Sequence, residues 1–259
     1  MIKTIDFQIP QLHSMKNYPK KLFYIGNSKL LENKMVSIVG TRKPNSYTKE
    51  FTHKLSIKLS SHNITIVSGA AMGVDAIAHK AAGAQNTIAV VANGLDIRYP
   101  SINKTLINDI ENNGLVLSAY NTGEKARSYT FVLRNEIVVS LGEVLIVTQA
   151  DLNSGSLRSI EYALNMGKKV YTLPHRINES LGTQELIKKG LCEVIYDIDE
   201  FIETITGRSI SVCYENDEFL TYCKESPTYD EAILKYSDKV FEYELLGKIE
   251  IKNGKVFVI

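Results

Sequence analysis

Two stretches of this chain join a run of β-branched residues to glycine, which is the pattern of a parallel strand that leads into a helix. They cover residues 36–42 and 66–75, with glycines at Gly40, Gly69 and Gly73. Glycine lets the backbone turn sharply and leaves successive amide N–H groups open to an anion. Phosphate-bearing ligands bind at this edge of open α/β sheets. The chemistry indicated is therefore anion binding by backbone amides.

Two cations follow the first glycine turn. Arg42 and Lys43 would add positive charge beside the amides that follow Gly40. Neither turn contains G-x-G-x-x-G and there is no Walker lysine, so a tightly held dinucleotide or a hydrolysed triphosphate is not indicated. The sequence shows no metal-ligand spacing. We therefore expect a phosphate-binding site without a metal or another cofactor.

Cations and aromatic residues lie close together in two further segments. Arg98 and Tyr99 follow a predicted strand, and residues 124–135 contain Lys125, Arg127, Tyr129, Phe131 and Arg134. Cations on phosphates beside aromatic rings on base faces are typical of a groove for single-stranded nucleic acid. Two structural alternatives stay open. For the first segment, the alternative is that Tyr99 packs in the core. For the second, the alternative is that residues 124–135 form a solvated loop leading into a helix with Phe131 buried.

Serine and histidine residues give two more candidates. Ser154-Gly155-Ser156 offers hydroxyl groups and unshielded amides at a helix start. It is not a G-x-S-x-G sequence, so phosphate or backbone binding is favoured over a serine nucleophile. Asp75 and His79 stand four residues apart on one predicted helix face and could pair. A structural pair at the helix start is favoured over general acid/base catalysis.

The elements that must position these residues alternate along the chain. Strands are predicted at 35–40, 64–68, 87–92, 115–118, 143–148, 169–173 and 193–196, and helices at 47–62, 73–83, 101–113, 129–141, 155–166 and 183–190. Several strands are unbroken apolar runs, which indicates burial on both faces. Residues 35–207 are therefore predicted to form an α/β domain with a doubly wound, mostly parallel sheet.

The segments on either side of this domain differ from it. Residues 1–34 hold one short apolar run and are predicted to be an arm or edge strand on the core. Residues 208–216 are predicted to be a linker. In residues 217–259, three short helices (217–224, 229–235 and 238–246) precede a hairpin that turns at Asn253-Gly254. This order predicts a small winged-helix-like α+β domain.

The composition is that of a soluble globular protein, with 259 residues, 44% of them hydrophobic and 23% charged. Residues 1–207 hold 23 Lys and Arg against 19 Asp and Glu, whereas residues 208–259 hold 7 against 10. This balance permits nucleic-acid binding without requiring it. Neither a signal-peptide stretch nor a membrane-spanning run is present, and Cys192, Cys213 and Cys223 form no C-x-x-C pair. We therefore expect a cytoplasmic protein with reduced cysteines and no membrane partner.

Taken together, these motifs resemble the DNA processing protein A (DprA, also Smf) family of bacterial transformation proteins. The residues that carry the resemblance are Ile38–Arg42, Ser68–Asp75 with Ala78-His79, Ala92–Asp96 with Tyr99-Pro100 and Asn103, Phe131 with Arg134-Asn135, Ser154–Leu157, and Gly182-Thr183. The resemblance implies an extended Rossmann-like fold that binds single-stranded DNA and forms a homodimer. It also implies protection of incoming DNA and help in loading a RecA-type recombinase during natural transformation, without catalysis.

The resemblance also indicates which residues contact DNA. They are Gly40, Thr41, Arg42, Lys43, Ser68, Gly69, Gly73, Arg98, Tyr99, Lys125, Arg127, Phe131, Arg134, Asn135, Ser154, Gly155 and Ser156. Asp75 and His79 are expected to be structural residues at a helix start.

Three positions depart from the usual pattern of the family. Ala119 stands where glutamate is usual, Glu136 where a second arginine follows Arg134-Asn135, and Pro174-His175 where proline-glycine is usual. An acid in place of an arginine weakens the expected DNA contact at Glu136, and His175 is interpreted as an exposed loop histidine. The chain begins close to the core, so we expect no N-terminal sterile-alpha-motif-like domain.

The alternative function is that of a Rossmann-like nucleotide phosphoribohydrolase or another nucleotide-binding enzyme. Those hydrolases resemble the same fold and carry a P-G-G-x-G-T turn with a glutamate close behind. Here the fifth predicted strand leads into residues 151–156, which lack the double glycine. Single-stranded DNA binding is therefore favoured over hydrolysis.

Overall fold

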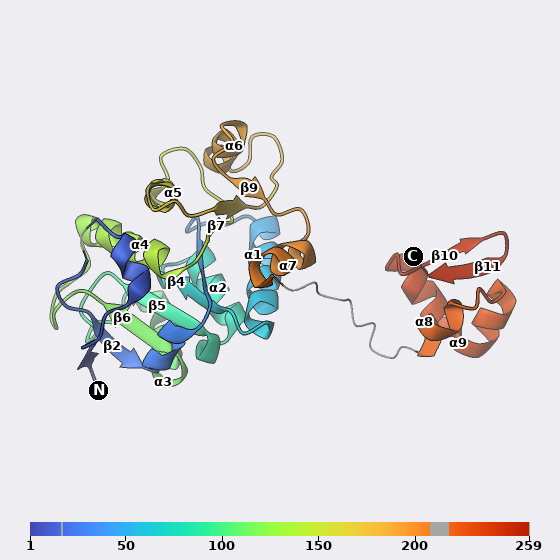
Figure 1. Cartoon of the computed structure of the whole chain (residues 1–259), viewed down its shortest axis with the longest axis horizontal. Coiled ribbons are helices and arrows are strands. Elements are labelled where there is room, and N and C mark those ends of the chain that lie inside the picture. The colour runs from blue at the N-terminus through green and yellow to red at the C-terminus, as the bar shows by residue number, and fades with distance from the viewer. Residues whose placement is uncertain (17, 208–217, 259) are drawn as a thin grey trace. The chain divides into compact units, whose positions relative to one another are not determined.

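The computed structural model describes residues 1–16, 18–207 and 218–258. The chain divides into two compact units, Met1–Thr206 and Gly207–Ile259 (Figure 1). The predicted linker, residues 208–216, lies outside the described residues, as does Cys213. Each unit has its own hydrophobic core.

The first unit is built on one large sheet, which has nine strands among the described residues. In sheet order they are β1 (Lys3–Thr4), β2 (Phe23–Gly26), β6 (Leu115–Ser118), β5 (Thr87–Val91), β4 (Thr65–Ser68), β3 (Met35–Val39), β7 (Leu145–Val147), β8 (Val170–Thr172) and β9 (Glu193–Val194). Strands β3 to β9 are parallel, whereas β2 pairs antiparallel with both β6 and β1. The prediction of a mostly parallel α/β sheet is confirmed, and every predicted strand is present.

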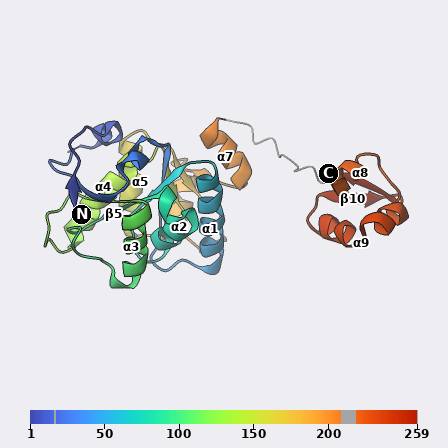
Figure 2. The ribbon, with the colours of Figure 1, turned by 90° about the horizontal axis from the view of Figure 1, so that it is seen from below.

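Helices cover both faces of this sheet. They are α1 (Ser46–Ser61), α2 (Val74–Ala82), α3 (Lys104–Asn113), α4 (Ser128–Leu141), α5 (Gly155–Asn165), α6 (Leu181–Lys188) and α7 (Ile198–Thr206), with short 3-10 helices η1 (Pro10–Ser14), η2 (Ser28–Glu32), η3 (Ala84–Asn86) and η4 (Ser101–Asn103). Helices α1, α2 and α3 form one layer, and α4 and α5 lie together in another (Figure 2). Helix α7, which the sequence reading missed, packs against α1.

The core explains why the strands are so apolar. Strands β3, β4, β5, β6 and β7 are buried along their whole length. Successive residues of a strand point to opposite faces. Accordingly, Val90 of β5 packs in a cluster with residues of α4 and α5, whereas Ala89 and Val91 pack in a second cluster with Ile107 and Ile110 of α3. Both faces of the sheet are therefore needed for the fold.

The N-terminal segment belongs to the same core. The edge strand expected there is present as β2, and β1 pairs with its outer side. Ile9 and Leu12 are almost fully buried in the main cluster. Glu136 of α4 is also buried and accepts a hydrogen bond from the amide of Lys16 at 3.1 Å. This N-terminal segment therefore packs against α4 and stabilises its position.

The order of the strands reverses between β3 and β7. From β3 the chain builds β4, β5 and β6 on one side, and then returns through α4 to place β7 on the other side of β3. In open α/β sheets, ligands bind at such a switch point, beyond the carboxyl ends of the strands. A ligand site is therefore expected at the loops after β3 and β7.

The second unit has its own small core, which contains Phe219, Leu220, Ala232 and Val240. It consists of α8 (Glu218–Cys223), α9 (Tyr229–Leu245), β10 (Ile249–Lys252) and β11 (Lys255–Val258). The hairpin turns at the predicted Asn253-Gly254, and a capping box of Thr228 and Glu231 begins α9. The two helices predicted at 229–235 and 238–246 form one element with a non-helical break at Tyr236.

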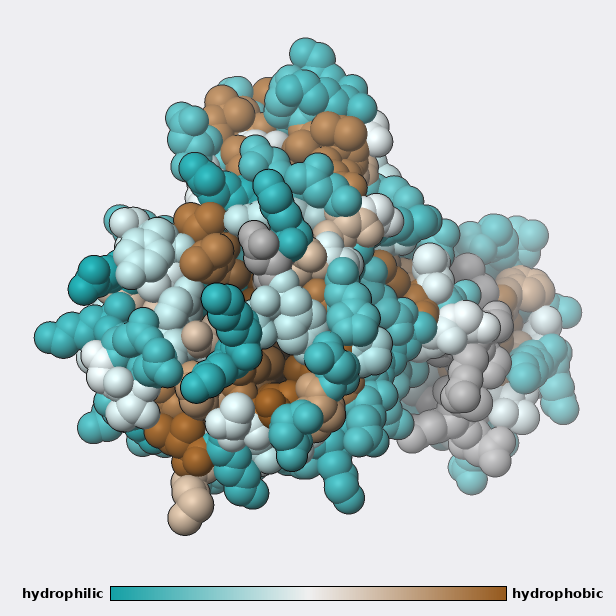
Figure 3. Space-filling view, turned by 60° about the vertical axis from the view of Figure 1, so that its left-hand side comes forward, coloured by the Kyte–Doolittle hydropathy of each residue, from teal (hydrophilic) through white to brown (hydrophobic). Residues whose placement is uncertain are grey.

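Hydrophobic residues are concentrated in these cores. On the face shown in Figure 3, hydrophilic residues predominate, and hydrophobic ones gather in small separate patches. Within the described ranges, every helix is too short or too polar to cross a membrane.

Candidate functional site

A pocket of about 900 Å³ lies at the switch point of the sheet. Loops after β3, β4 and β7 and residues of α4 and α5 line it. We call it the switch-point pocket. It brings together these residues of the predicted site: Gly40, Thr41, Arg42, Lys43, Gly69, Phe131, Arg134, Asn135, Ser154, Gly155 and Ser156.

The loop after β3 is locked to the start of α2. The amide of Val74 donates to the carbonyl of Thr41 at 3.2 Å, and the amide of Thr41 donates to the carbonyl of Gln149 at 2.9 Å. Gly73 has φ of +82°, and a Cβ there would collide with the carbonyl oxygen of Thr41 and lie 2.6 Å from the carbonyl carbon of Arg42. Glycine is therefore required for the two loops to approach so closely. The contact fixes the backbone that carries Arg42 at the pocket rim.

Arg134 and Asp75 form the floor of the switch-point pocket. Both are buried. Arg134 donates to the carbonyl of Val90 at 2.7 Å and to that of Gly69, while the Asp75 carboxylate accepts the amides of Gly69 at 3.2 Å and Ala71 at 3.3 Å. Burial raises the pKa of Asp75, and Arg134 opposes that rise; burial also lowers the pKa of Arg134, and Asp75 opposes that fall. Arg134 is thus a cation that holds the glycine turn in place.

Aromatic rings stand at the edge of the pocket. The ring centroids of Tyr99 and Phe131 are 6.0 Å apart, and the guanidinium groups of Arg42 and Arg134 lie 5.5 and 5.7 Å from the Phe131 centroid. Tyr99 is 48% exposed, so the alternative that it packs in the core is wrong. Phe131 is half-buried, so the alternative of a fully buried ring is also wrong. We call Tyr99 and Phe131 the aromatic pair.

The wall opposite Arg42 is the N-terminus of α5. Ser154 caps this helix by accepting the amide of Ser156 at 3.2 Å, as predicted. A Cβ at Gly155 would meet no atom within 4 Å, so this backbone faces open space. One turn further on, Arg158 also lines the pocket, as does Asp151. The sequence reading missed Arg158, although its position four residues after the Ser154 cap is a signal that could have found it.

Several predicted contacts lie outside the switch-point pocket. Arg98 does not line the pocket, and its guanidinium donates to Glu111 at 2.6 Å and to the carbonyl of Leu95 at 2.9 Å. The buried hydroxyl of Ser68 donates to the carbonyl of Ile38 at 2.6 Å and is structural. Lys125 and Arg127 are exposed on the segment before α4.

The predicted pairing of Asp75 with His79 is wrong. His79 is fully buried, and its Nδ1 lies 2.6 Å from the hydroxyl of Thr87. That hydroxyl donates to the carbonyl of Ile66 at 2.8 Å, so it accepts a hydrogen bond from the Nδ1–H of the imidazole. Burial, together with the charge of Arg134, lowers the pKa of His79 to about 3. A neutral histidine that packs in this way is structural and does not act as a general acid or base.

The three departures from the family pattern have separate explanations. Glu136 points away from the pocket to the amide of Lys16, so it does not put an acid at the site. Ala119 is half-buried against the main core. The interpretation of His175 as an exposed loop histidine is wrong, because its side chain has no exposed surface and its Nε2 lies 2.7 Å from the carbonyl of Thr148.

Comparisons with known proteins show the family of this chain. The family model of DNA recombination-mediator protein A matches residues 2–206. The DNA processing protein DprA of Streptococcus pneumoniae is 38% identical over 183 residues, which are 69% of this chain and 64% of that protein. Protein Smf of Escherichia coli is 33% identical over 205 residues, which are 77% and 54% of the two chains. The chain thus matches less than two thirds of the length of these curated relatives.

Two solved structures share the fold of the first unit. DNA processing protein A from Helicobacter pylori, whose structure was described for its single-stranded DNA binding mode, superposes with a TM-score of 0.78 and 39% identity, over 80% of this chain and 96% of that one. The X-ray structure of DNA processing protein A from Streptococcus pneumoniae gives a TM-score of 0.72 and 35% identity, over 78% and 73%.

Proposed function

Because the chain belongs to the DNA recombination-mediator protein A family, as its motifs predicted, we propose that it binds single-stranded DNA in the switch-point pocket. The single-stranded DNA binding described for the Helicobacter pylori relative supports this proposal. The DNA phosphates contact Arg42, Lys43 and the uncovered backbone of Gly155 at the start of α5, and the bases stack on the aromatic pair.

The observation that carries the proposal is the positive charge of the pocket beside the N-terminus of α5. Four cations line it (Arg42, Lys43, Arg134 and Arg158) against two acids (Asp75 and Asp151). The excess of positive charge, the helix N-terminus and the adjoining rings match the needs of a polyanion with accessible base faces. Arg134 contributes charge from the floor, because its Nη1 is bound to two carbonyls and its Nε to the side chain of Asn135.

Single strands should bind more tightly than duplex DNA. Bases must be splayed out before they can stack on Tyr99, Phe131 or the exposed Tyr129, and a closed duplex hides their faces. The test is a titration with single-stranded and double-stranded oligonucleotides of one sequence at several salt concentrations. Equal affinities for the two forms at moderate salt would count against base stacking.

A binding role without catalysis fits the side chains of the pocket. Asp75 is committed to two amides and lies beside Arg134, and His79 is buried and neutral. The alternative, a nucleotide phosphoribohydrolase, predicts turnover of nucleoside monophosphates. We expect no release of free base in an assay run beside the DNA titration, and steady release would favour the enzyme.

The biological role that we propose is that of a cytoplasmic homodimer that protects incoming DNA during natural transformation and helps to load a RecA-type recombinase. The family description of a recombination mediator supports it. Sedimentation of the protein tests the dimer. Recombinase filament formation on single-stranded DNA coated with a competing binding protein, with and without this chain, tests the loading.

A further inference from the structure

A second pocket, of about 510 Å³, lies beside the switch-point pocket and has no role in the site described above. One loop links the two, because Gly40 to Lys43 line the first pocket and Asn45 to Tyr47 line the second. Two residues of extended chain span at most roughly 7 Å, so Lys43 and Asn45 lie within reach of adjacent groups on one strand. Gln149 fixes this loop by bonding to the amides of Thr41 at 2.9 Å and Asn45 at 3.1 Å.

The buried imidazole of His175 leaves one acceptor without a partner. Its Nε2 lies 2.7 Å from the carbonyl oxygen of Thr148, which can only accept, so Nε2 carries the proton. In the neutral ring Nδ1 is then a bare acceptor. This atom is buried, and no group among the described residues donates to it. A buried acceptor without a donor is costly, which indicates that something else donates to it.

A second acceptor stands next to the first. The Glu179 carboxylate is 4.0 Å from Nδ1 of His175 and cannot donate to it. Asn45 donates to the same carboxylate at 3.4 Å, while its own oxygen is used by the amide of Thr48 at 2.8 Å. The polar wall of the pocket therefore suits a ligand with two N–H donors, one for Nδ1 of His175 and one for the carboxylate. A phosphate or another anion lacks these donors and would be repelled by Glu179.

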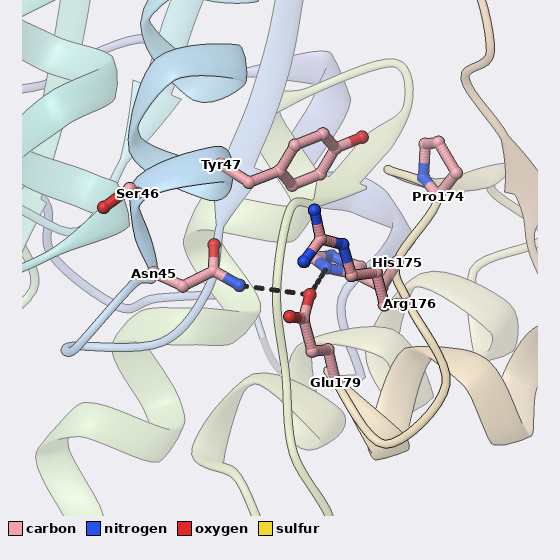
Figure 4. Close-up of a pocket in the computed structure, with 7 residues that line it drawn as sticks. All are labelled: Asn45, Ser46, Tyr47, Pro174, His175, Arg176 and Glu179. Carbon is pink, nitrogen blue, oxygen red and sulfur yellow. Dashed lines mark hydrogen bonds and ion pairs between the residues drawn. The ribbon is translucent and has the colours of Figure 1, made fainter.

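A planar ligand fits the remaining walls. Figure 4 shows the side chains of Tyr47, His175, Arg176 and Glu179 turned toward one space. The Tyr47 ring meets the imidazole edge to face, with centroids 5.6 Å apart. Burial and the nearby Glu179 raise the pKa of Tyr47, so its ring stays neutral. Arg176 is exposed, so its guanidinium is able to move aside and stack on a ring that enters.

We propose that the second pocket receives a nucleobase of the bound strand that carries an exocyclic amino group, whose two hydrogens are donated to Glu179 and to Nδ1 of His175. This inference rests on the proposed function. Cytosine and thymine have nearly the same size, but cytosine presents the amino donor N4 where thymine presents the acceptor O4. The pocket therefore discriminates between them.

The test compares the affinities of the full chain for 20-residue oligomers of deoxycytidine and thymidine by fluorescence anisotropy at pH 7.5. One good contact to a base edge contributes about 1 kcal/mol or more of binding free energy, so we expect a preference of about fivefold or more for cytosine. Glu179→Ala should abolish this preference. The matched control is Glu185→Ala, which removes the same charge from an exposed pair with Lys189 outside the pocket and should keep the preference.

The outcomes separate this inference from the function on which it rests. Equal affinity of the unaltered chain for both oligomers, or a preference that survives in Glu179→Ala, overturns the second pocket, even where Arg42→Ala weakens binding to both. Failure to bind either oligomer overturns the proposed function and this inference with it. Melting transitions of both variants at the temperature of the unaltered chain show that the fold is intact.

Discussion

Arg42 and Arg134 flank the ring of Phe131 but have different roles. Arg42 is exposed at the rim of the switch-point pocket, where its guanidinium can contact a phosphate. Arg134 is buried, and its Nη1 donates to the carbonyls of Gly69 and Val90 while its Nε donates to Asn135. The sequence places both next to glycine turns or aromatic residues, yet only packing decides which one is free. The two can be separated by experiment, since one should affect DNA affinity and the other stability.

Arg42→Ala should weaken single-strand binding without unfolding the protein. Loss of one phosphate contact should lower the slope of log affinity against log salt by about 0.7. The measurement is a salt series with a long oligothymidine. Arg98→Ala is the matched control, because Arg98 is held by Glu111 and should leave affinity and slope unchanged. Unchanged binding by Arg42→Ala would place the DNA elsewhere.

Arg134→Met should destabilise the fold by about 3–5 kcal/mol, because it leaves Asp75 buried without its opposing charge and two carbonyls without a donor. Urea unfolding measures the change. Arg158→Met removes an exposed cation of the same pocket and should alter stability by no more than about 0.5 kcal/mol. Equal stability of the two variants would show that the floor pair is not structural.

Sequence reasoning identified most of the switch-point pocket because glycines and helix starts mark the carboxyl ends of strands. It did not predict the pairing of Arg98 with Glu111, which lies thirteen residues away on α3 and is brought near only by the fold. It also placed Asp75 with His79 on spacing alone, whereas Thr87 of the adjacent strand takes the imidazole. Side-chain contacts between residues of different elements leave no local pattern in the sequence.

At the scale of elements, the switch-point pocket depends on the close approach of the loop after β3 to the start of α2. Gly73→Ala would push a Cβ into the backbone of Thr41 and Arg42. Because backbone cannot move aside as a flexible side chain does, we expect a loss of more than about 2 kcal/mol in unfolding free energy and weaker DNA binding.

Gly123→Ala is the matched control for this prediction. Gly123 has φ of +85°, close to that of Gly73, but a Cβ there would meet nothing within 4 Å. It should therefore show only the conformational cost, about 1 kcal/mol, and normal affinity. If both variants lose the same stability, the positive φ alone explains the effect and the interlocked loops do not matter.

The predicted elements were most accurate where periodicity was strong. All parallel strands were found because each is an apolar run bounded by turns. Helix α7 was missed although Ile198, Phe201, Ile202 and Ile205 recur at helical spacing, so the signal was present in the sequence. The break of α9 at Tyr236 was anticipated as a gap between two helices, but whether such a gap becomes a turn or a kink depends on packing.

At the scale of the whole molecule, charge is divided between the units. The first unit holds the switch-point pocket with its excess of cations. In the second unit, the later half of α9 exposes Asp238, Glu242 and Glu244, the surface that a winged helix would present to a DNA groove. Of the two wing lysines, Lys252 is paired with Glu250 at 2.7 Å. Exposed acids therefore stand among the lysines of these elements, which weakens the attraction to a DNA groove.

A fragment of residues 1–207 should therefore keep most of the single-strand affinity, and isolated residues 208–259 should show little. Acids that approach a phosphate backbone release no condensed counterions, so the acidic face of α9 gains nothing from DNA and loses affinity by repulsion. Both pieces have their own core, which makes separate folding testable by circular dichroism and thermal melting. Titration of each piece with the same oligothymidine measures the affinities. A folded 1–207 fragment that no longer binds single strands would transfer the primary DNA site to the C-terminal unit.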